Sequence, residues 1–584
     1  MKVDITKNRS YDEAMPEKID IPNVPVNAIL KGSVRRYARK DAYIYRDRRI
    51  TYEQVYRESW KFANALRKMG VGRGTVVSAH LPTCPQYIAA YYGIVLSGAT
   101  YSPINPYLPE ADLLFQLNDS DTEVVITHES VADSVRRLFD RTKLKNAIVT
   151  GDQEMFSNDD PINTSLYGEK WHSFAALKAA NSEEEFNPGV DPENDLVHIA
   201  YTGGTTGSPK GVMITHANLV SNVCQMAGWV AGCLPRVEDD GALVFEPAEK
   251  DEANYIEKYK IPLGEEIRLS PSPLFHITGG IGLIVSPMAQ GATTVLPDRF
   301  EPVQFLEFIE KYKVSSVTGA PAMWNVLLNM PTIKEYDFST IRNVSSGAAP
   351  LSNEEVKRLK STFPNARVVE GYGLTEATAS VATGVCVTGG IFKLGTVGLP
   401  SYNTEIKVVS LEGESDEPLP ANQGGEICIR GPQVMKGYYK KPEETAATIK
   451  NGWLHTGDIG IIDEDGYLSI IDRKKDMLIY NGYNIYPSRI EEILVTHPDV
   501  VNAIVIGKPA KTVGEIPKAF VIPRQGATVS EEEIMEFINT RVVHYSKVRE
   551  LEFVDQFPMT AAGKISKVAL KNKELERDLE KMKE

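Results

Sequence analysis

The chain has 584 residues, with 64 basic and 78 acidic side chains and a formal net charge of −14 at pH 7. This acidic balance argues against a nucleic-acid-binding protein, which usually presents a basic face. Five scattered cysteines without a C-x-x-C pair are typical of reduced intracellular thiols rather than of disulfides or a zinc site. We find neither a signal peptide nor an apolar stretch of about 18 residues, so we expect a cytoplasmic protein without a membrane span.

Strand-like and helical patterns alternate from about Ala42 onward. Thr51 and Gln54 form a capping-box start for a helix, residues 75–81 are typical of a buried strand, and residues 86–99 are helical in pattern. Further strand-like runs are EVVIT, NAIVT, DLVHIAY, ATTVL, KVSSVTG, RNVSSG and ARVVEGYG. The alternation predicts an α/β fold with parallel sheets covered by helices, in which ligands bind beyond the carboxyl ends of strands.

Two segments interrupt this pattern. Residues 237–260 are acidic and weakly periodic, and we interpret them as a solvated surface excursion without chemistry. After residues 470–492 the chain predicts a compact α+β unit, so we divide it into a large N-terminal domain (1–472), a hinge (473–475) and a small C-terminal domain (476–584). The charged tail from residue 571 is expected to be a solvated helical end.

The stretch YTGGTTGSPKG, residues 201–211, is rich in glycine and hydroxyl side chains and contains one lysine. A Walker A loop needs the last glycine directly before the lysine, and here two residues separate Gly207 from Lys210. Glycine backbones can turn N–H groups toward a phosphate, but such a loop can also be a flexible turn. The candidate phosphate-binding residues are Thr202, Gly203, Gly204, Thr205, Thr206, Gly207, Ser208 and Lys210.

Seven further motifs follow this loop in a fixed order. They are PLFHITGG, SSGAAPLS, EGYGLTE, GEICIRGPQVMKGYY, GWLHTGDIG, DRKKD and PMTAAGKISK. Together with the loop they resemble, over nearly the whole chain, the adenylate-forming superfamily, which comprises acyl-CoA synthetases, carrier-protein adenylation domains and beetle luciferases. The resemblance implies a large domain of helix-covered sheets and a small mobile α+β domain that carries a catalytic lysine.

The resemblance implies a nucleotide site built from four of these motifs. Tyr372 would stack on adenine, Asp458 would accept hydrogen bonds from the ribose hydroxyls, and Arg473 would assist there. Glu376 would ligate Mg²⁺ and Thr375 would donate to the α-phosphate. The remaining residues implied at this site are Gly347, Ala348, Ala349, Gly371, Gly373 and Leu374.

The resemblance also implies a pocket for a carboxylic acid. His276 would line the carboxylate-binding site or gate it, without acting as a general base, because a carboxylate is already ionised at pH 7. Thr318, Ala320 and Trp324 are candidate wall residues, although Trp324 fits a core position equally well. Acetate-activating relatives carry tryptophan at the position of Gly373, so we interpret this glycine as leaving room for a longer acid.

The small domain would serve both half-reactions. Lys564 would stabilise the charge that develops on the α-phosphate and the attacking carboxylate. Lys475 matches the pivot residue, and after rotation Gly482 and Tyr483 would face the pantetheine arm of CoA. Ile479 departs from the lysine of the plant-ligase and luciferase branches, which puts a polar contact at that position in doubt.

We therefore expect an ATP-dependent ligase that uses Mg²⁺ and CoA to convert a carboxylic acid into its CoA thioester through an acyl-adenylate. Medium- to long-chain fatty acids are the first expectation for the acid. Adenylation for a carrier protein and ligation of aryl, branched or hydroxy acids remain open, and so does a homodimer. A P-loop NTPase fails on the loop spacing.

Overall fold

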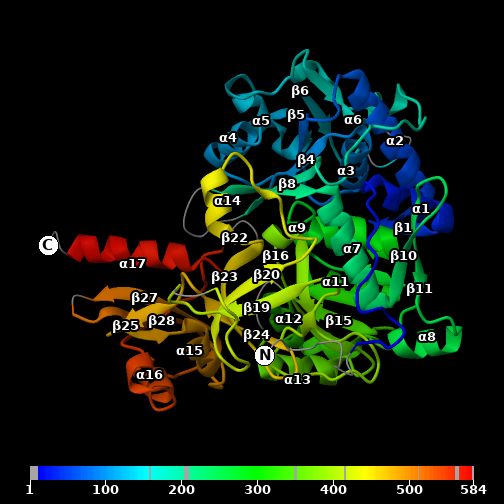
Figure 1. Ribbon diagram of the computed structural model, residues 1–584. Coiled ribbons are helices and arrows are strands. Elements are labelled where there is room, and N and C mark those ends of the chain that lie inside the picture. Colours follow the sequence, from blue (N-terminus) through cyan, green and yellow to red (C-terminus); the bar gives the residue numbers. More distant parts are fainter. Residues whose placement is uncertain are drawn as a thin grey trace.

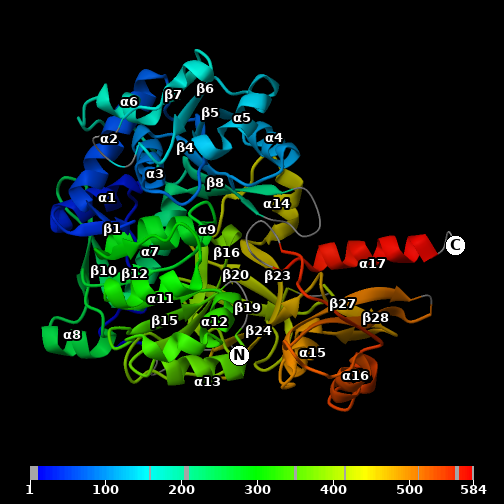
Figure 2. The ribbon, with the colours of Figure 1, turned by 180° about the vertical axis from the view of Figure 1, so that it is seen from behind.

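The computed structural model describes residues 11–154, 156, 160–202, 209–347, 351–413, 416–510, 512–559 and 565–581. Among the described residues, a large unit contains three larger sheets and one two-stranded sheet with helices around them, and a small unit coloured orange to red lies beside it (Figure 1). The view from behind shows the same separation (Figure 2). No helix among the described residues combines the length and apolarity that a membrane crossing requires.

The first sheet has eight strands in the order β21-β9-β8-β4-β3-β5-β6-β7. Its core strands are parallel, while β8 and β9 form an antiparallel pair. The bounds are β3 Val76–His80, β4 Thr100–Pro103, β5 Thr122–His128, β6 Asn146–Thr150, β7 Trp171–Ser173, β8 Leu196–Thr202, β9 Lys210–Thr215 and β21 Gly437–Tyr438.

The second sheet has nine strands in the order β18-β17-β16-β15-β14-β12-β13-β1-β2. Strands β12 to β16 run parallel, so their carboxyl ends meet at one edge. The bounds are β1 Asp41–Tyr45, β2 Arg48–Thr51, β12 Ile267–Leu269, β13 Thr293–Val295, β14 Ser316–Gly319, β15 Asn343–Ser346, β16 Arg367–Leu374, β17 Ala379–Thr383 and β18 Leu399–Pro400.

A third, antiparallel sheet completes the large unit and leads into the small one. Its strands are β19 Glu405–Val409, β20 Gly425–Arg430, β22 Ile449–Lys450, β23 Trp453–Ile462 and β24 Leu468–Arg473. The small unit has its own sheet and its own apolar core. Its strands are β25 Leu478–Tyr480, β26 Tyr483–Ile485, β27 Val500–Ala510, β28 Gly514–Pro523 and β29 Glu550–Phe553.

Helices cover the sheets, as the alternating sequence pattern predicts. Thr51 and Gln54 form the capping box expected at the start of the second helix. The helices are α1 Asn27–Tyr37, α2 Tyr52–Lys68, α3 Pro85–Ser97, α4 Glu110–Asp119, α5 Ala132–Leu138, α6 Phe174–Ala179, α7 His216–Ala231, α8 Glu252–Tyr259, α9 Ile277–Gly279, α10 Ser286–Gln290, α11 Pro302–Lys311, α12 Pro321–Leu328, α13 Asn353–Thr362, α14 Pro442–Thr448, α15 Pro487–Leu494, α16 Glu531–Asn539 and α17 Lys567–Lys581. The predicted α/β fold class is confirmed.

One of two expectations about surface segments is wrong. The acidic excursion forms a hairpin, β10 Cys233–Val237 and β11 Leu243–Pro247, followed by α8, in which Tyr255 and Tyr259 are buried. The charged tail from residue 571 is helical, as expected, and belongs to α17, where Asn572, Lys573, Leu575 and Glu576 are exposed. Glu574 is the exception, because it is buried and lies 2.8 Å from Lys518 in an ion pair.

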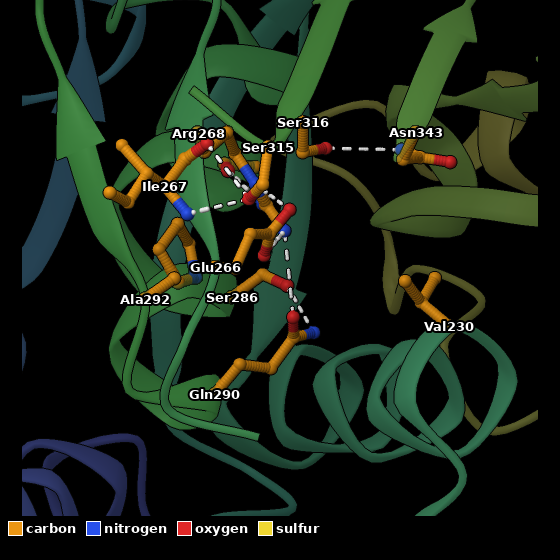
Figure 3. Close-up of polar contacts among 12 residues, drawn as sticks. Val230, Glu266, Ile267, Arg268, Ser286, Gln290, Ala292, Ser315, Ser316 and Asn343 are labelled. Atoms are coloured by element: carbon orange, nitrogen blue, oxygen red, sulfur yellow. Dashed lines mark hydrogen bonds and ion pairs between the residues drawn. The ribbon is translucent and has the colours of Figure 1, made fainter. Parts of the chain in front are cut away.

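A polar cluster lies near the amino ends of the parallel strands (Figure 3). Ser315 Oγ accepts a hydrogen bond from the Ile267 N–H at 2.9 Å, and Asn343 Nδ2 donates to Ser316 Oγ at 3.1 Å. A hollow beside it is lined in part by Glu266, Gln290, Asn343 and Arg367. Because ligands of such sheets bind at the opposite, carboxyl edge, we interpret this cluster as structural.

Candidate functional site

The glycine loop connects two antiparallel strands. Thr202, the last residue of β8, pairs in register with Lys210, the first residue of β9. Residues 203–208, which include the predicted phosphate-binding residues Gly203 to Ser208, lie outside the described part of the chain. A Walker A loop opens a helix, whereas β9 separates this loop from α7. The strands on both sides of the loop agree with the sequence spacing, which also excludes a Walker A motif.

Tyr438 brings the loop lysine and the predicted metal ligand together. Lys210 Nζ lies 4.8 Å from the centre of the Tyr438 ring, a cation–π distance. The Tyr438 hydroxyl donates to Glu376 Oε1 at 2.9 Å. Sequence reasoning missed Tyr438, although it lies in the motif GEICIRGPQVMKGYY. Tyr438 comes close to Lys210 because β21 pairs with β9, and this pairing of distant segments cannot be read from the motif.

Asp458, Tyr372 and Arg473 form a second group. The Tyr372 hydroxyl donates to Asp458 Oδ2 at 2.7 Å, and Arg473 Nε lies 3.3 Å from Asp458 Oδ1. Asp458 and Arg473 are register partners on β23 and β24. A carboxylate accepts several hydrogen bonds, which suits the predicted contact of Asp458 with ribose hydroxyls. The ribose and adenine roles of the group stay predictions.

Three glycines meet where β14, β15 and β16 end or approach their ends. The Gly347 N–H donates to the Gly319 carbonyl at 3.4 Å, and a Cβ at Gly347 would lie 3.5 Å from the Gly371 carbonyl oxygen. The ends of β14 and β15 and the adjoining part of β16 therefore lie side by side at the carboxyl edge. Ala348 and Ala349, predicted at the adenine turn, lie outside the described residues.

Glu370 is a functional candidate that sequence reasoning did not single out. Its Oε2 accepts a hydrogen bond from the Leu351 N–H at 3.0 Å, across the adenine turn. Burial raises the pKa of the Glu370 carboxyl to about 7, and the nearby charge of Glu355 adds to the rise. No sequence motif carries this signal, because it depends on the packing around the end of β16.

His276 caps the short helix α9. Its Nδ1 accepts a hydrogen bond from the Thr278 N–H at 3.3 Å, and a π-helix, Gly280–Val285, follows. π-helical turns are often found at functional sites. The half-buried position of His276 beyond the end of β12 is compatible with a pocket, and its role there stays a prediction.

The structure shows the surroundings of two residues named for the acid pocket, and for Trp324 it favours the core position that the sequence left open. Trp324 is fully buried in the apolar core, with its ring centre 6.2 Å from that of Phe363, so it is a core residue and not an accessible wall. A Cβ at Gly373 would lie 1.6 Å from the Ala379 carbonyl oxygen. Gly373 therefore permits the close approach of β16 and β17, and its influence on the length of the acid pocket stays a prediction. Thr318 and Ala320, at the end of β14, stay candidates.

The region between the two units contains the predicted hinge. Burial lowers the pKa of Lys475 and the charge of Arg473 lowers it further, while Asp458 and Glu376 act in the opposite direction. Lys475 therefore lies within electrostatic range of the site in the large unit. The boundary at residues 473–475 stays a prediction.

The predicted CoA-facing residues lie in the β25–β26 hairpin. Asn481 and Gly482 have φ values of 48° and 81°, as in a two-residue turn that favours glycine. The Tyr483 ring is 56% exposed and stacks on Tyr545 with 4.7 Å between ring centres. Lys564 lies outside the described residues, but a β-bridge between Met559 and Ile565 closes the segment that contains it.

One further cluster has metal-ligand chemistry. Asp416, Cys428 and His455 each place a ligand atom within 4.8 Å of the others. Lys407 Nζ lies 3.2 Å from the Asp416 carboxylate, so a resident ammonium group already compensates that charge. Burial also raises the pKa of Cys428 to about 12, which disfavours a thiolate ligand. We assign no metal to this cluster.

Lys210 and Glu376 thus lie near the carboxyl ends of β8 and β16 in two different sheets, and Tyr372 of β16 links this region to Asp458 on the third sheet. The fold matches the crystal structure of ATP-bound MatB from Rhodopseudomonas palustris with a TM-score of 0.79 and 24% identity, covering 94% of this chain and 99% of that one.

The family models define the class of the protein. The model "AMP-binding enzyme" matches residues 30–439, and "AMP-binding enzyme C-terminal domain" matches residues 489–564. The chain belongs to the AMP-binding enzyme family, so the resemblance to adenylate-forming enzymes is confirmed. It is 33% identical to a long-chain-fatty-acid–CoA ligase of Bacillus subtilis over 97% of both chains. It is 35% identical to 4-coumarate–CoA ligase 1 of Petroselinum crispum over 91% of this chain and 90% of that one.

Proposed function

We propose that the protein is an ATP-dependent acyl-CoA ligase of the AMP-forming acid–thiol class. The observation that carries the proposal is the approach of Lys210 and Glu376 on either side of Tyr438, near the carboxyl ends of the strands. One cation for phosphate oxygens and one carboxylate for a hard metal ion suit a nucleoside triphosphate with Mg²⁺. The curated relatives named above are CoA ligases, which supports a thiol as the second acceptor.

The first half-reaction forms the acyl-adenylate. An oxygen of the ionised acid attacks the α-phosphorus of ATP, the bond to the pyrophosphate oxygen breaks, and pyrophosphate leaves. Asp458 and Arg473 hold the ribose, Lys210 attracts phosphate oxygens, and Glu376 would hold Mg²⁺, which neutralises phosphate charge. Lys564 stabilises charge on the α-phosphate. No side chain becomes covalently attached.

The second half-reaction forms the thioester. The CoA sulfur attacks the acyl carbon, the bond to the AMP oxygen breaks, and the thiol proton passes to solvent. Lys564 is not needed for this step, so the small unit turns about Lys475 and presents Gly482 and Tyr483 to the pantetheine arm. Hinges of this kind are a few residues at the ends of elements.

For the acid, we propose a medium- to long-chain fatty acid. The full-length correspondence with the long-chain-fatty-acid–CoA ligase of Bacillus subtilis supports this choice. The second candidate is an aryl acid, because 4-coumarate–CoA ligases of plants are similarly related. Gly373 does not favour either, since its missing side chain faces the β17 backbone.

The test is a panel of acids of both kinds, with purified protein, ATP and Mg²⁺. We expect pyrophosphate release only with the matching acid, and thioester formation only after CoA is added. Pyrophosphate release without CoA-dependent AMP formation for any acid would contradict the ligase proposal. Selective use of cinnamic-type acids would replace the fatty acid by the aryl acid.

A further inference from the structure

The helical segment that follows His276 contains a wide turn. Helix α9 passes directly into a π-helix, Gly280–Val285, and then into α10. The Ser286 N–H donates to the Ile281 carbonyl, five residues earlier, as in a π-helical turn. Pro287 has no N–H, so the segment lacks one of the donors that would satisfy the carbonyl groups one turn earlier. Carbonyl groups of the wide turn therefore need donors from elsewhere in the fold.

Three side chains from other elements supply these donors. Arg268 of β12 donates from Nη1 to the Gly282 carbonyl at 2.7 Å. The Tyr92 hydroxyl of α3 donates to the Ile284 carbonyl at 3.1 Å, and the Tyr43 hydroxyl of β1 lies 3.3 Å from the same oxygen. The wide turn is thus tied to two strands of the second sheet and to α3.

Arg268 is itself fixed by a carboxylate (Figure 3). Its Nε donates to Glu266 Oε1 at 3.2 Å, and its Nη2 donates to Glu266 Oε2 at 2.7 Å. The two side chains are only 13% and 9% exposed. A bidentate pair of this kind fixes the direction of the guanidinium group as well as adding stability. Because both of its ends are bound, Arg268 is a firm link between the start of β12 and the wide turn.

This link closes a loop of the chain that contains His276. The chain runs from β12 through His276, and the helical segment then brings Gly282 back beside Arg268. A Cβ at Gly279 would lie 2.0 Å from the Pro273 carbonyl oxygen, so the two arms of the loop are in close contact. A Cβ at Gly282, in contrast, would meet no atom within 4 Å outside its own helix. Arg268 therefore holds a turn that borders open space and that belongs to the same loop as His276.

We propose that Arg268 is a positioning residue for the carboxylic acid, because it holds the wide turn Gly280–Val285 in the shape that the acid pocket requires. The proposal rests on the proposed function and on the predicted place of His276 at the carboxylate of the acid. Removing the link leaves the Gly282 carbonyl without its charged donor and lets the turn move. The predicted nucleotide contacts lie on other elements, so the binding of ATP should not change.

The main test is the double variant Arg268→Met with Glu266→Gln, which leaves no buried charge without its partner. Acid-dependent pyrophosphate release is measured with octanoate, palmitate and cinnamate, and gives a KM for each acid and for Mg²⁺–ATP. We expect the KM for the best of these acids to rise by about 10-fold or more, the amount that one methylene group is worth in an apolar pocket. The KM for Mg²⁺–ATP should stay at the wild-type value. An unchanged KM for the acid, or an equal rise of both KM values, would overturn the positioning role.

Two tyrosine variants separate positioning from stability. Tyr92→Phe removes a hydrogen bond to the wide turn, whereas Tyr52→Phe removes a bond to the Ala292 carbonyl at 2.7 Å, beyond the end of α10. Both tyrosines are fully buried, so we expect similar falls in melting temperature. Only Tyr92→Phe should raise the KM for the acid, by about 3- to 10-fold.

This comparison decides the proposal even if the double variant fails to fold. Equal effects of the two tyrosine variants on the KM for the acid would reduce the contacts of the wide turn to a contribution to stability, and would overturn the proposal. A wild-type protein that releases no pyrophosphate with any acid would overturn the proposed function itself.

Discussion

The nucleotide-binding edge of the large unit and the lysine-bearing segment of the small unit are built in different ways. In the large unit the functional side chains contact one another directly: Tyr438 binds Glu376, and Tyr372 binds Asp458. In the small unit, residue 564 lies outside the described part of the chain, and the contacts that can be described are those of its neighbours: a bridge between Met559 and Ile565 and the packing of Ile565 against an apolar cluster. We therefore expect the nucleotide-binding groups to be held in place before ATP binds, and the predicted catalytic charge of Lys564 to come from the separate small unit.

The largest expected effect is that of Lys564→Ala. Loss of a charge aimed at the developing α-phosphate charge should raise the adenylation barrier by several kcal/mol, which is about 10³-fold or more in rate. The measurement is acid-dependent pyrophosphate release by wild type and variant.

Thioester formation from pre-made acyl-adenylate is the control for this variant. It should be largely retained, because the lysine belongs to the unit that turns away. An equal fall in the rates of both half-reactions would contradict a role of Lys564 in adenylation alone.

The second prediction concerns the titration of Glu370. Its pKa is about 7 in the folded protein, against an ordinary value of 4.5. Between these values the unfolded chain loses the proton while the folded protein retains it, so stability falls as pH rises and levels off above about pH 7. Glu370→Gln keeps an acceptor for the Leu351 N–H without this titration.

Glu370→Gln should therefore gain up to about 3 kcal/mol of unfolding free energy relative to wild type between pH 5 and pH 8. Denaturant unfolding of both proteins at the two pH values measures the difference. A constant difference between the two curves would show that folding does not raise the pKa of Glu370.

A smaller effect is expected for Tyr438→Phe. The ring that faces Lys210 stays, but the hydrogen bond to Glu376 is lost, which is worth about 1 kcal/mol. We expect the KM for Mg²⁺–ATP to rise by about 3- to 10-fold, while thioester formation from acyl-adenylate is unchanged. Tyr439→Phe, on the neighbouring residue whose hydroxyl binds Asp121, is the matched control and should leave this KM unaltered.

Much of the fold and of the nucleotide site could be predicted from the sequence, because the signals are local. The capping box at Thr51 and the strand runs lead directly to the α/β assignment, and each nucleotide motif is a contiguous stretch. What sequence could not predict depends on contacts between distant segments. Tyr438 reaches Glu376 from a strand 62 positions later, and α17 looks solvated until Lys518 neutralises Glu574.

The acid pocket shows the same limit, and Trp324→Phe tests it. Trp324 was a candidate for the pocket wall, yet its side chain is fully buried, and its Nε1 finds no hydrogen-bond partner among the described residues. Trp324→Phe should therefore change the unfolding free energy by about 1–3 kcal/mol as a core substitution. The ratios of kcat/KM between acids should stay the same, which is the smallest effect predicted here. Ala320→Leu is the contrasting variant, because Ala320 is exposed at the end of β14, and it should lower kcat/KM for the longer acids. A change of acid preference in Trp324→Phe but not in Ala320→Leu would show that Trp324 lines the acid pocket and that Ala320 does not.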